Sequence, residues 1–261
     1  MEKLVIIPTF NEKENITDIL KAIFAQQKGF HVLVVDDNSP DGTASIVKSL
    51  FDAYPQQLFM LERPGKQGLG TAYIHGFRWA LEKGYQFIFE MDADFSHDPI
   101  DLERLYEACK FNGADVAVGS RYVPGGMIEN WPSDRHIYSK GGAFYTRILT
   151  GMPVKDPTAG FICYTSKVLE TINLNAIQFI GYAFQIEMKF AAWKLGFKIT
   201  EIPIVFRDRK KGNSKMSKNI LKEGVLGVLK IEWNSWFSSY KKNTSRVLSN
   251  DKSKQPVEDK Q

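Results

Sequence analysis

The chain is poor in the residue types that mark several classes of protein. It has two cysteines, Cys109 and Cys163, so it can form at most one disulfide, and neither cysteine has a metal-ligand partner at short spacing. We therefore interpret both as buried thiols in a reducing compartment. Its four histidines are scattered, and none stands in a local motif with a serine or cysteine nucleophile, which disfavours hydrolase chemistry.

Long hydrophobic runs are also lacking. The first aliphatic run is only four residues long before Pro8, far short of the apolar region of a secretory signal. Every other apolar stretch is broken well before the roughly 18 to 20 residues that a bilayer span needs. We therefore expect a cytoplasmic protein that is at most peripheral on the cytosolic face of a membrane.

Neither sign of charge is in large excess. Lys and Arg number 34 and Asp and Glu 30, so the net charge is +4, too small to hold nucleic acid by bulk electrostatics. No nucleic-acid partner is expected. The charge is distributed unevenly along the chain, because the segment from Arg207 to Arg246 carries 11 basic and three acidic residues. Positive charge is therefore concentrated near the C-terminus.

What the chain does have is enough hydrophobic sequence, 43% of 261 residues, for one large domain or two small ones. Short aliphatic runs alternate with amphipathic stretches in its first half. The pattern predicts strands at residues 4–8, 32–35, 58–61, 87–91, 116–118 and 198–206, and helices at about 44–51, 71–83, 135–150, 181–195 and 219–240. Near-continuous apolar strands that alternate with helices indicate an α/β fold, a mostly parallel sheet with helices on both faces.

Polar residues follow the predicted strands, at the sheet edge where ligands of such folds bind. Asp92 and Asp94 stand at i and i+2, a spacing that aims both carboxylates to one side, and such oxygen ligands suit Mg²⁺ or Mn²⁺. The alternative is that two acidic residues simply end a strand. Asp36 and Asp37 end a neighbouring strand in the same way, and either would suit ribose hydroxyls or a base as an acceptor.

The glycine-containing run from Gly65 to Gly70 precedes a predicted helix and allows two interpretations. It could cradle a phosphate at the helix N-terminus, or its glycines could simply permit a tight loop. Its spacing is neither that of a P-loop nor that of a dinucleotide-binding fingerprint. An enzyme of hydride transfer is therefore disfavoured.

Several motifs together resemble a known family. They are Pro8-Thr9-Phe10-Asn11-Glu12, the run from Val34 to Thr43, Gly68-Leu69-Gly70-Thr71-Ala72-Tyr73, Met91-Asp92-Ala93-Asp94-Phe95-Ser96-His97, Gly119-Ser120-Arg121-Tyr122, Gly181 to Met188, and Arg209 with Gly212 to Lys215. Over about residues 3 to 218 the chain resembles the polyprenol-phosphate (dolichol-phosphate) mannosyltransferases. These are inverting family 2 glycosyltransferases of GT-A fold, a Rossmann-like architecture.

The resemblance implies a role for particular residues of this sequence. The nucleoside would be held by Pro8, Phe10, Glu12, Val35 and Asp37. Asp92, Ala93 and Asp94 would hold the diphosphate through Mg²⁺ or Mn²⁺, with Ser96 as a further candidate ligand where some relatives carry glutamine. The acceptor phosphate would be held by Arg121, Arg135 and Ser139, and a mobile loop carrying Arg209 and Lys215 would close over the donor. Phe10 replaces a frequent tyrosine, so stacking is kept and one hydroxyl is lost.

The implied reaction is transfer of mannose from GDP-mannose to a polyprenyl monophosphate lipid with inversion at the anomeric carbon. Asp92, Asp94 and Arg121 would be the catalytic residues. The rivals are the same reaction with another donor such as UDP-glucose, a nucleotidyltransferase, and a non-catalytic nucleotide-sugar-binding subunit. Arg121 could also be only a salt-bridged loop residue, and the basic residues near Arg209 only a solvated loop.

We expect three regions along the chain. Residues 1–218 form the GT-A catalytic domain, 219–242 form an amphipathic helical segment, and 243–261 form a disordered polar tail. The helical segment mixes aliphatic and aromatic residues with lysines, a composition suited to a membrane surface. The alternatives are packing on the catalytic domain or against a membrane-anchored partner subunit.

Overall fold

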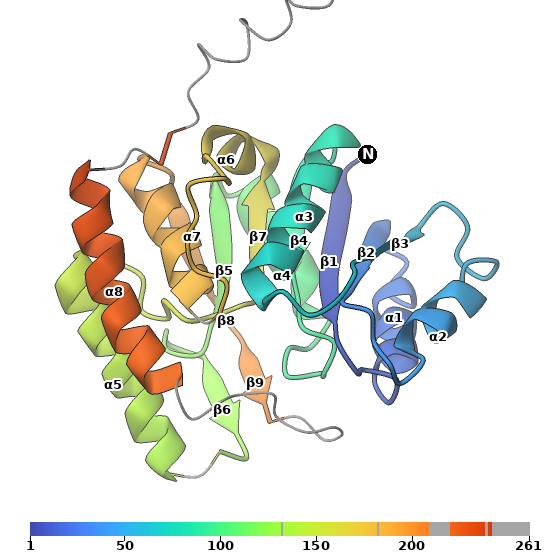
Figure 1. The fold of residues 1–261 in the computed structure, drawn as a ribbon, viewed down its shortest axis with the longest axis horizontal. Coiled ribbons are helices and arrows are strands. Elements are labelled where there is room, and N and C mark those ends of the chain that lie inside the picture. Colours follow the sequence, from blue (N-terminus) through green and yellow to red (C-terminus); the bar gives the residue numbers. More distant parts are fainter. Residues whose placement is uncertain (132, 182, 209–219, 238–239, 242–261) are drawn as a thin grey trace, which may run out of the picture.

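A computed structural model of the chain describes residues 1–131, 133–181, 183–208, 220–237 and 240–241. Figure 1 shows an open sheet with helices packed on both of its faces. The strands are β1 (Lys3–Thr9), β2 (Phe30–Asp36), β3 (Leu58–Glu62), β4 (Phe87–Glu90), β5 (Val116–Ser120), β6 (Met127–Glu129), β7 (Ile162–Thr165), β8 (Ile199–Pro203) and β9 (Val205–Arg207). The helices are α1 (Ile16–Phe24), α2 (Thr43–Ser49), α3 (Leu69–Glu82), α4 (Asp101–Lys110), α5 (Ser133–Thr150), α6 (Ser166–Thr171), α7 (Ala183–Lys194) and α8 (Ile220–Phe237).

The main sheet has seven strands in the order β3-β2-β1-β4-β7-β5-β8. Its neighbours are parallel except around β7, which is antiparallel to both β4 and β5. The carboxyl ends of β1, β2, β4 and β5 therefore lie at one edge of the sheet. The predicted mostly parallel α/β sheet is confirmed.

Alternation along the strands explains why helices cover both faces. In β1, Leu4 and Ile6 pack with α3 and α7, whereas Val5 and Ile7 pack with α1 and α4. All four side chains are fully buried. A strand whose two faces are both apolar cannot face water on either side, so each face needs a layer of helices.

Parts of the second half differ from the prediction. The run at 198–206 is two strands, because the chain leaves the main sheet after Pro203, and Val205–Arg207 pairs with β6 in a small second sheet. Neither α4 nor β7 was predicted. Strand β7 is only four residues long and its antiparallel direction breaks the strand and helix alternation on which the prediction rested.

The helices expected near residues 135–150, 181–195 and 219–240 are present as α5, α7 and α8. Helix α8 packs against α5 and α7 (Figure 1), and its side chains Val228 and Ile231 are buried. Within the part of the chain that the structure describes, no helix is long and apolar enough to cross a membrane. The predicted polar tail, 243–261, lies outside the described residues.

Candidate active site

The ends of β1 and β2 are joined by hydrogen bonds through Asp36. Its carboxylate accepts from the Thr9 hydroxyl at 2.8 Å and from the Ser39 hydroxyl at 2.6 Å, and the Asp36 side chain is fully buried. The Ser39 hydroxyl in turn accepts from the backbone N–H of Asn11 at 3.0 Å. Asp36 therefore shapes the turns after the two strands, and of the two adjacent carboxylates Asp37 is the better placed for a ligand.

Asp37 is held by an arginine that the sequence analysis did not single out. Arg63, directly after β3, donates from Nε to the Asp37 carboxylate at 2.6 Å and from Nη1 to the Thr71 hydroxyl at 2.7 Å. Both members of this ion pair are buried. A charge-assisted bond of this kind fixes a carboxylate in one orientation.

The other residues predicted to hold the nucleoside lie around the same strand ends. Pro8 faces Val35 in the register of β1 and β2, and Val35 is fully buried. The backbone N–H of Glu12 donates to the Thr43 hydroxyl at 3.0 Å, which ties the first loop to the start of α2. The ring of Phe10 lies 5.1 Å from the ammonium of Lys66. The structure thus brings Pro8, Phe10, Glu12, Val35 and Asp37 together.

Asp92 and Asp94 occupy a tight loop directly after β4. Asp94 is buried, and its carboxylate accepts from the backbone N–H of Ser96 at 3.0 Å across Phe95, whose φ is +59°. Asp92 is partly exposed, and Ala93 between the two is buried. Beneath the loop, burial and then the charge of Asp92 raise the pKa of Tyr73 well above its ordinary value. The loop therefore lies against the buried core.

A layer of buried polar side chains lies below this loop. Glu90 of β4 and Lys189 of α7 are both fully buried. Glu90 accepts from the Gln185 amide at 2.6 Å, and Lys189 donates to the Ala159 carbonyl at 2.6 Å. Burial raises the pKa of Glu90 and lowers the pKa of Lys189. Through these bonds α7 fixes both the end of β4 and the loop that precedes β7.

Arg121, at the end of β5, is held in a closely defined position. Its Nε and Nη2 donate to the two carboxylate oxygens of Asp156 at 2.7 and 2.6 Å, and its backbone N–H donates to the same group at 2.9 Å. The Arg121 side chain is 10% exposed and that of Asp156 is 0% exposed. The guanidinium also lies over the rings of Tyr122, Trp131 and Phe206, at 5.3 to 5.7 Å from their centres.

The other residues predicted to hold the acceptor phosphate lie on α5. The Ser139 hydroxyl accepts from the Tyr122 hydroxyl at 2.6 Å, which places it beside Arg121. Arg135 lies one turn earlier, 4.0 Å from the centre of the Trp131 ring, and its Nη1 donates to the Asp208 carboxylate at 3.1 Å. The structure therefore brings Arg121 and Ser139 to one place, with Arg135 nearby and engaged with Asp208.

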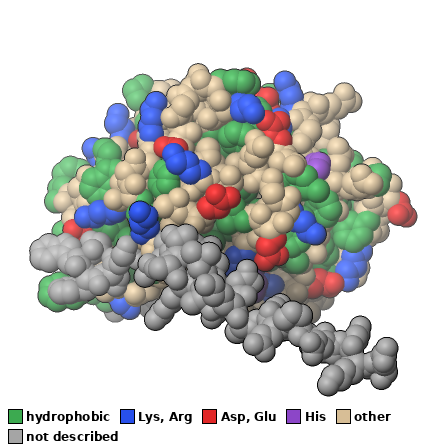
Figure 2. All heavy atoms as spheres, turned by 90° about the horizontal axis from the view of Figure 1, so that it is seen from above, with side chains coloured by type: hydrophobic (Ala, Val, Ile, Leu, Met, Phe, Trp, Pro, Cys, Tyr) green, Lys and Arg blue, Asp and Glu red, His purple; other side chains and the backbone are tan. Residues whose placement is uncertain are grey.

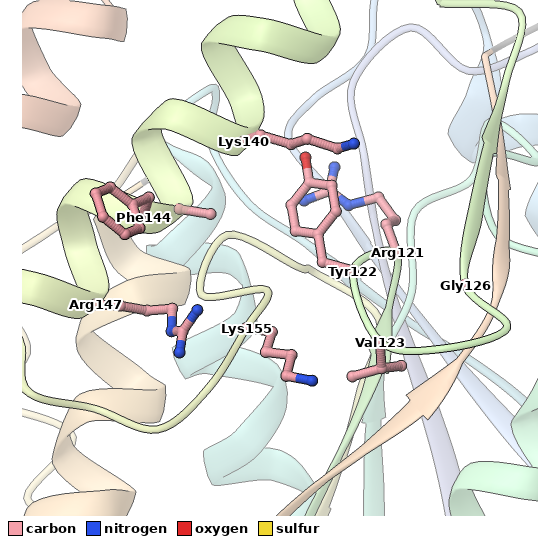
Figure 3. A pocket seen from close by; sticks show the side chains of 9 residues that line it. Arg121, Tyr122, Val123, Gly126, Lys140, Phe144, Arg147 and Lys155 are labelled. Atoms are coloured by element: carbon pink, nitrogen blue, oxygen red, sulfur yellow. The ribbon is translucent and has the colours of Figure 1, made fainter.

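Next to Arg121 the surface is hollowed by a pocket of about 380 Å³ between α5 and the loops around β5. Figure 3 shows Lys140 and Arg147 extending from α5 toward Arg121 and Lys155. The pocket is lined by Arg121, Tyr122, Val123, Gly126, Lys140, Ala143, Phe144, Arg147 and Lys155. Its lining therefore combines four cationic side chains with apolar and aromatic ones.

The glycines between Gly65 and Gly70 are explained by packing. A Cβ on Gly70 would lie 2.7 Å from the Phe184 ring and 2.8 Å from the Phe179 carbonyl oxygen, and one on Gly68 would lie 3.0 Å from Ile180. Gly68 also has a φ of +99°. These contacts support the tight-loop interpretation over the phosphate cradle.

The structure does not describe every predicted site residue, and it adds some that were missed. Arg209 and Lys215 lie outside the described residues, so their role stays a prediction. Among the described residues, no three or more His, Cys, Asp or Glu side chains form a group that could hold a metal. Asp156, in the loop between α5 and β7, was missed because a single acidic residue in a loop carries no signal of its own.

Comparison with known proteins shows the family. The sequence profile described as glycosyl transferase family 2 matches residues 4–172. The chain is 46% identical to a polyprenol monophosphomannose synthase of Mycolicibacterium smegmatis over 88% of this chain and 86% of that one. It is also 46% identical to an undecaprenyl-phosphate mannosyltransferase of Micrococcus luteus over 87% of this chain and 93% of that one.

A solved structure has the same fold. Glucosyl-3-phosphoglycerate synthase from Mycobacterium tuberculosis, crystallised with Mn²⁺, UDP and glucosyl-3-phosphoglycerate, aligns with a TM-score of 0.66 over 88% of this chain and 79% of that one, at 15% identity. This likeness concerns the fold alone and confirms the GT-A arrangement expected from the sequence. The sequence matches show that the chain belongs to glycosyl transferase family 2, among the polyprenol-phosphate mannosyltransferases.

Proposed function

We propose that the chain transfers mannose from GDP-mannose to a polyprenyl monophosphate with inversion at the anomeric carbon. The observation that carries the proposal is the juxtaposition of two carboxylates in the loop after β4 with a rigidly held arginine and a cationic pocket after β5. The names of the relatives with 46% identity support the same substrates. The strand ends around Asp37 would receive the nucleoside of the donor.

The reaction requires that the substrates be positioned and their charges neutralised, and it does not depend on a strong general base. A phosphate monoester has a second pKa near 6 and is already mostly ionised at neutral pH, so it is itself the nucleophile. One in-line displacement forms the bond from a phosphate oxygen to the anomeric carbon, breaks the bond to GDP and inverts the configuration. Arg121 would orient the attacking phosphate, because Asp156 and the surrounding rings hold its guanidinium in one place.

Asp92 and Asp94 fit a divalent cation by the chemistry of their oxygen donors. A Mg²⁺ or Mn²⁺ ion usually takes one or two carboxylates and completes its coordination with water and substrate phosphates, which agrees with a loop that offers two aspartates. Such an ion would neutralise charge on the departing diphosphate. Ser96 presents its backbone N–H to Asp94, so its first role is to hold that carboxylate in place.

The proposal is tested with purified protein, polyprenyl phosphate and radiolabelled GDP-mannose or UDP-glucose. We expect a mannosylated lipid phosphate and GDP with the first donor, whereas release of pyrophosphate would indicate a nucleotidyltransferase. Asp94→Asn should abolish transfer and keep the fold, because the amide oxygen still accepts from Ser96 but binds a cation poorly. Near-normal transfer in the presence of EDTA would refute the requirement for a divalent cation.

We also propose that the protein reaches its lipid substrate as a peripheral protein on the cytosolic face of a membrane. Helices α5 and α8 lie side by side at one end of the molecule (Figure 1) and expose large apolar side chains there. These are Ile137, Tyr138, Phe144, Ile148, Leu226, Leu229 and Trp233, each 49% to 71% exposed. Figure 2 shows hydrophobic and basic side chains next to each other at that end. A membrane-anchored partner subunit is the alternative occupant of this surface.

Sedimentation with anionic vesicles tests this placement. Phe144→Asp with Trp233→Asp should reduce binding at low salt, since each removes an apolar side chain and adds a repelled charge. Phe111→Asp is the matched control, because Phe111 is 71% exposed at the end of α4, away from α5 and α8. If the unchanged protein does not bind anionic vesicles at any salt concentration, a partner subunit is the better explanation.

A further inference from the structure

The pocket beside Arg121 contains more positive charge than the catalytic arrangement uses. Asp156 neutralises Arg121, since the two form a buried ion pair. The lining also includes Lys140 and Arg147 from α5 and Lys155 from the loop before β7. These three side chains are exposed, and none of them forms an ion pair with another residue that the structure describes. The net charge of the pocket is therefore about +3 from these side chains alone.

The carboxylate of Glu201 ties together the two loops that form one side of this pocket. Glu201 of β8 accepts from the backbone N–H of Lys155 at 2.8 Å and from that of Asp156 at 2.9 Å. The same carboxylate accepts from the Ser120 hydroxyl at 2.7 Å, directly before Arg121. Lys155 is thus fixed at its backbone to the segment that carries Arg121, and it lines the pocket from the loop before β7.

An apolar hollow continues from the cationic pocket. A second hollow of about 220 Å³ shares Phe144 and Arg147 with the first, and its other lining residues are Ile148, Gly151, Met152 and Pro153. Arg147 and Phe144 therefore stand at the boundary between a cationic and an apolar region. A ligand that is an anion at one end and a hydrocarbon at the other fits this sequence of surfaces.

We propose that Lys140, Arg147 and Lys155 bind the phosphate of the lipid acceptor and make the enzyme specific for a prenyl monophosphate, whose first hydrocarbon units lie against Phe144 and Ile148. This proposal rests on the proposed function, because it assigns further residues to the acceptor of that reaction. Three exposed cations suit a dianionic monophosphate, which Arg121 and Arg135, already paired with Asp156 and Asp208, do not balance. The three residues bind the acceptor and take no part in donor binding.

Kinetics with each substrate varied separately test this assignment. Arg147→Gln should raise the KM for polyprenyl phosphate about fivefold, and the triple variant Lys140→Gln/Arg147→Gln/Lys155→Gln about a hundredfold, with the KM for GDP-mannose unchanged. Arg147→Lys should restore most of the loss. Lys48→Met is the matched control, since Lys48 is an exposed lysine on α2, at the other end of the molecule (Figure 1). A rise in the KM for the donor instead would overturn the proposal.

A binding experiment distinguishes binding of the acceptor from binding of membrane lipids. It also tests the assignment of the pocket independently of the proposed function. Calorimetry measures binding of a ten-carbon prenyl monophosphate in water, without vesicles, with the corresponding prenol as the uncharged control. We expect the triple variant to lose this binding. If that binding is unchanged while attachment to anionic vesicles is lost, the cations bind phospholipid headgroups and the proposal is wrong. If prenyl phosphate binding depends on the three cations but no mannose is transferred, the proposed function fails and the assignment of the pocket stands.

Discussion

The ion pair between Arg121 and Asp156 provides a sharp test of how the acceptor side of the site is built. Asp156→Asn keeps the shape of the side chain and removes its charge. The Arg121 guanidinium then stays in a place where it is only 10% exposed, among aromatic rings, and has lost the carboxylate that accepts from its Nε and Nη2. Removing one member of a buried ion pair costs about 3–5 kcal/mol, because the remaining charge has lost most of its hydration.

We therefore expect Asp156→Asn to lower the free energy of unfolding by about 3–5 kcal/mol in urea, and the melting temperature by roughly 10 °C. Thr158→Val is a substitution next to the same ion pair, and we expect a smaller loss of stability from it. It removes one 2.9 Å hydrogen bond from Arg121 Nη2 but leaves the charge pair intact, so it should cost about 1 kcal/mol.

A double variant tests the charge pair directly. Arg121→Met with Asp156→Asn removes both charges, so it should be more stable than Asp156→Asn alone by at least about 2 kcal/mol. Its transfer activity should nevertheless be lost, since the group that orients the acceptor phosphate is gone. If Asp156→Asn costs less than about 1 kcal/mol, or if the second substitution recovers nothing, the buried charge pair is not what fixes Arg121.

Two further predictions concern the support of the site. Burial lowers the pKa of His97 to about 4, below the value of about 6.5 in the unfolded chain, so the unfolded state takes up the proton first and stability falls as the pH drops from about 6.5 toward 4. Between pH 7.5 and pH 5 His97 contributes a loss of about 2 kcal/mol, so over this range the unfolding free energy in urea should fall by about that much more for the unchanged protein than for His97→Phe; equal pH dependence of both would refute it. Gly70→Ala should destabilise by about 1–3 kcal/mol, because its Cβ would meet Phe184 at 2.7 Å, whereas Gly141→Ala in exposed α5 has open space and should stabilise by up to about 1 kcal/mol. Equal effects of the two alanines would show that the close approach at Gly70 is not rigid.

The sequence predicts best those parts of the fold in which local pattern and final environment agree. The strands at residues 4–8 and 32–35 are apolar throughout and bounded by polar turns, and they are buried on both faces in β1 and β2. The pair Asp92 and Asp94 is recognisable because it directly follows such a strand. In these places a short window of sequence holds all the information that determines the structure.

The features that were missed depend on contacts between distant segments. Arg63 is one of many basic residues in the sequence, and only the fold brings it to Asp37, 26 residues away. Asp156 reaches Arg121 across 35 residues, and Lys140, Arg147 and Lys155 meet only because α5 packs beside the loop before β7. No periodicity or spacing expresses these pairs, so single-sequence reasoning cannot supply them.

The place of β7 in the sheet has a consequence for the order in which the protein folds. Strands β4 and β5 are separated in the sheet by β7, yet β7 is made after both of them, at Ile162–Thr165. A growing chain that ends before Ile162 therefore leaves β4 with one unpaired edge and β5 with two, since β8 also comes later, and such edges invite intermolecular pairing. The half of the sheet that carries Asp92 and the half that carries Arg121 come into register only when these four residues insert between them. Donor and acceptor sides are thus aligned by a strand that contributes no side chain to the proposed chemistry. Slow insertion of this strand would delay the appearance of activity more than it delays the burial of either half of the sheet.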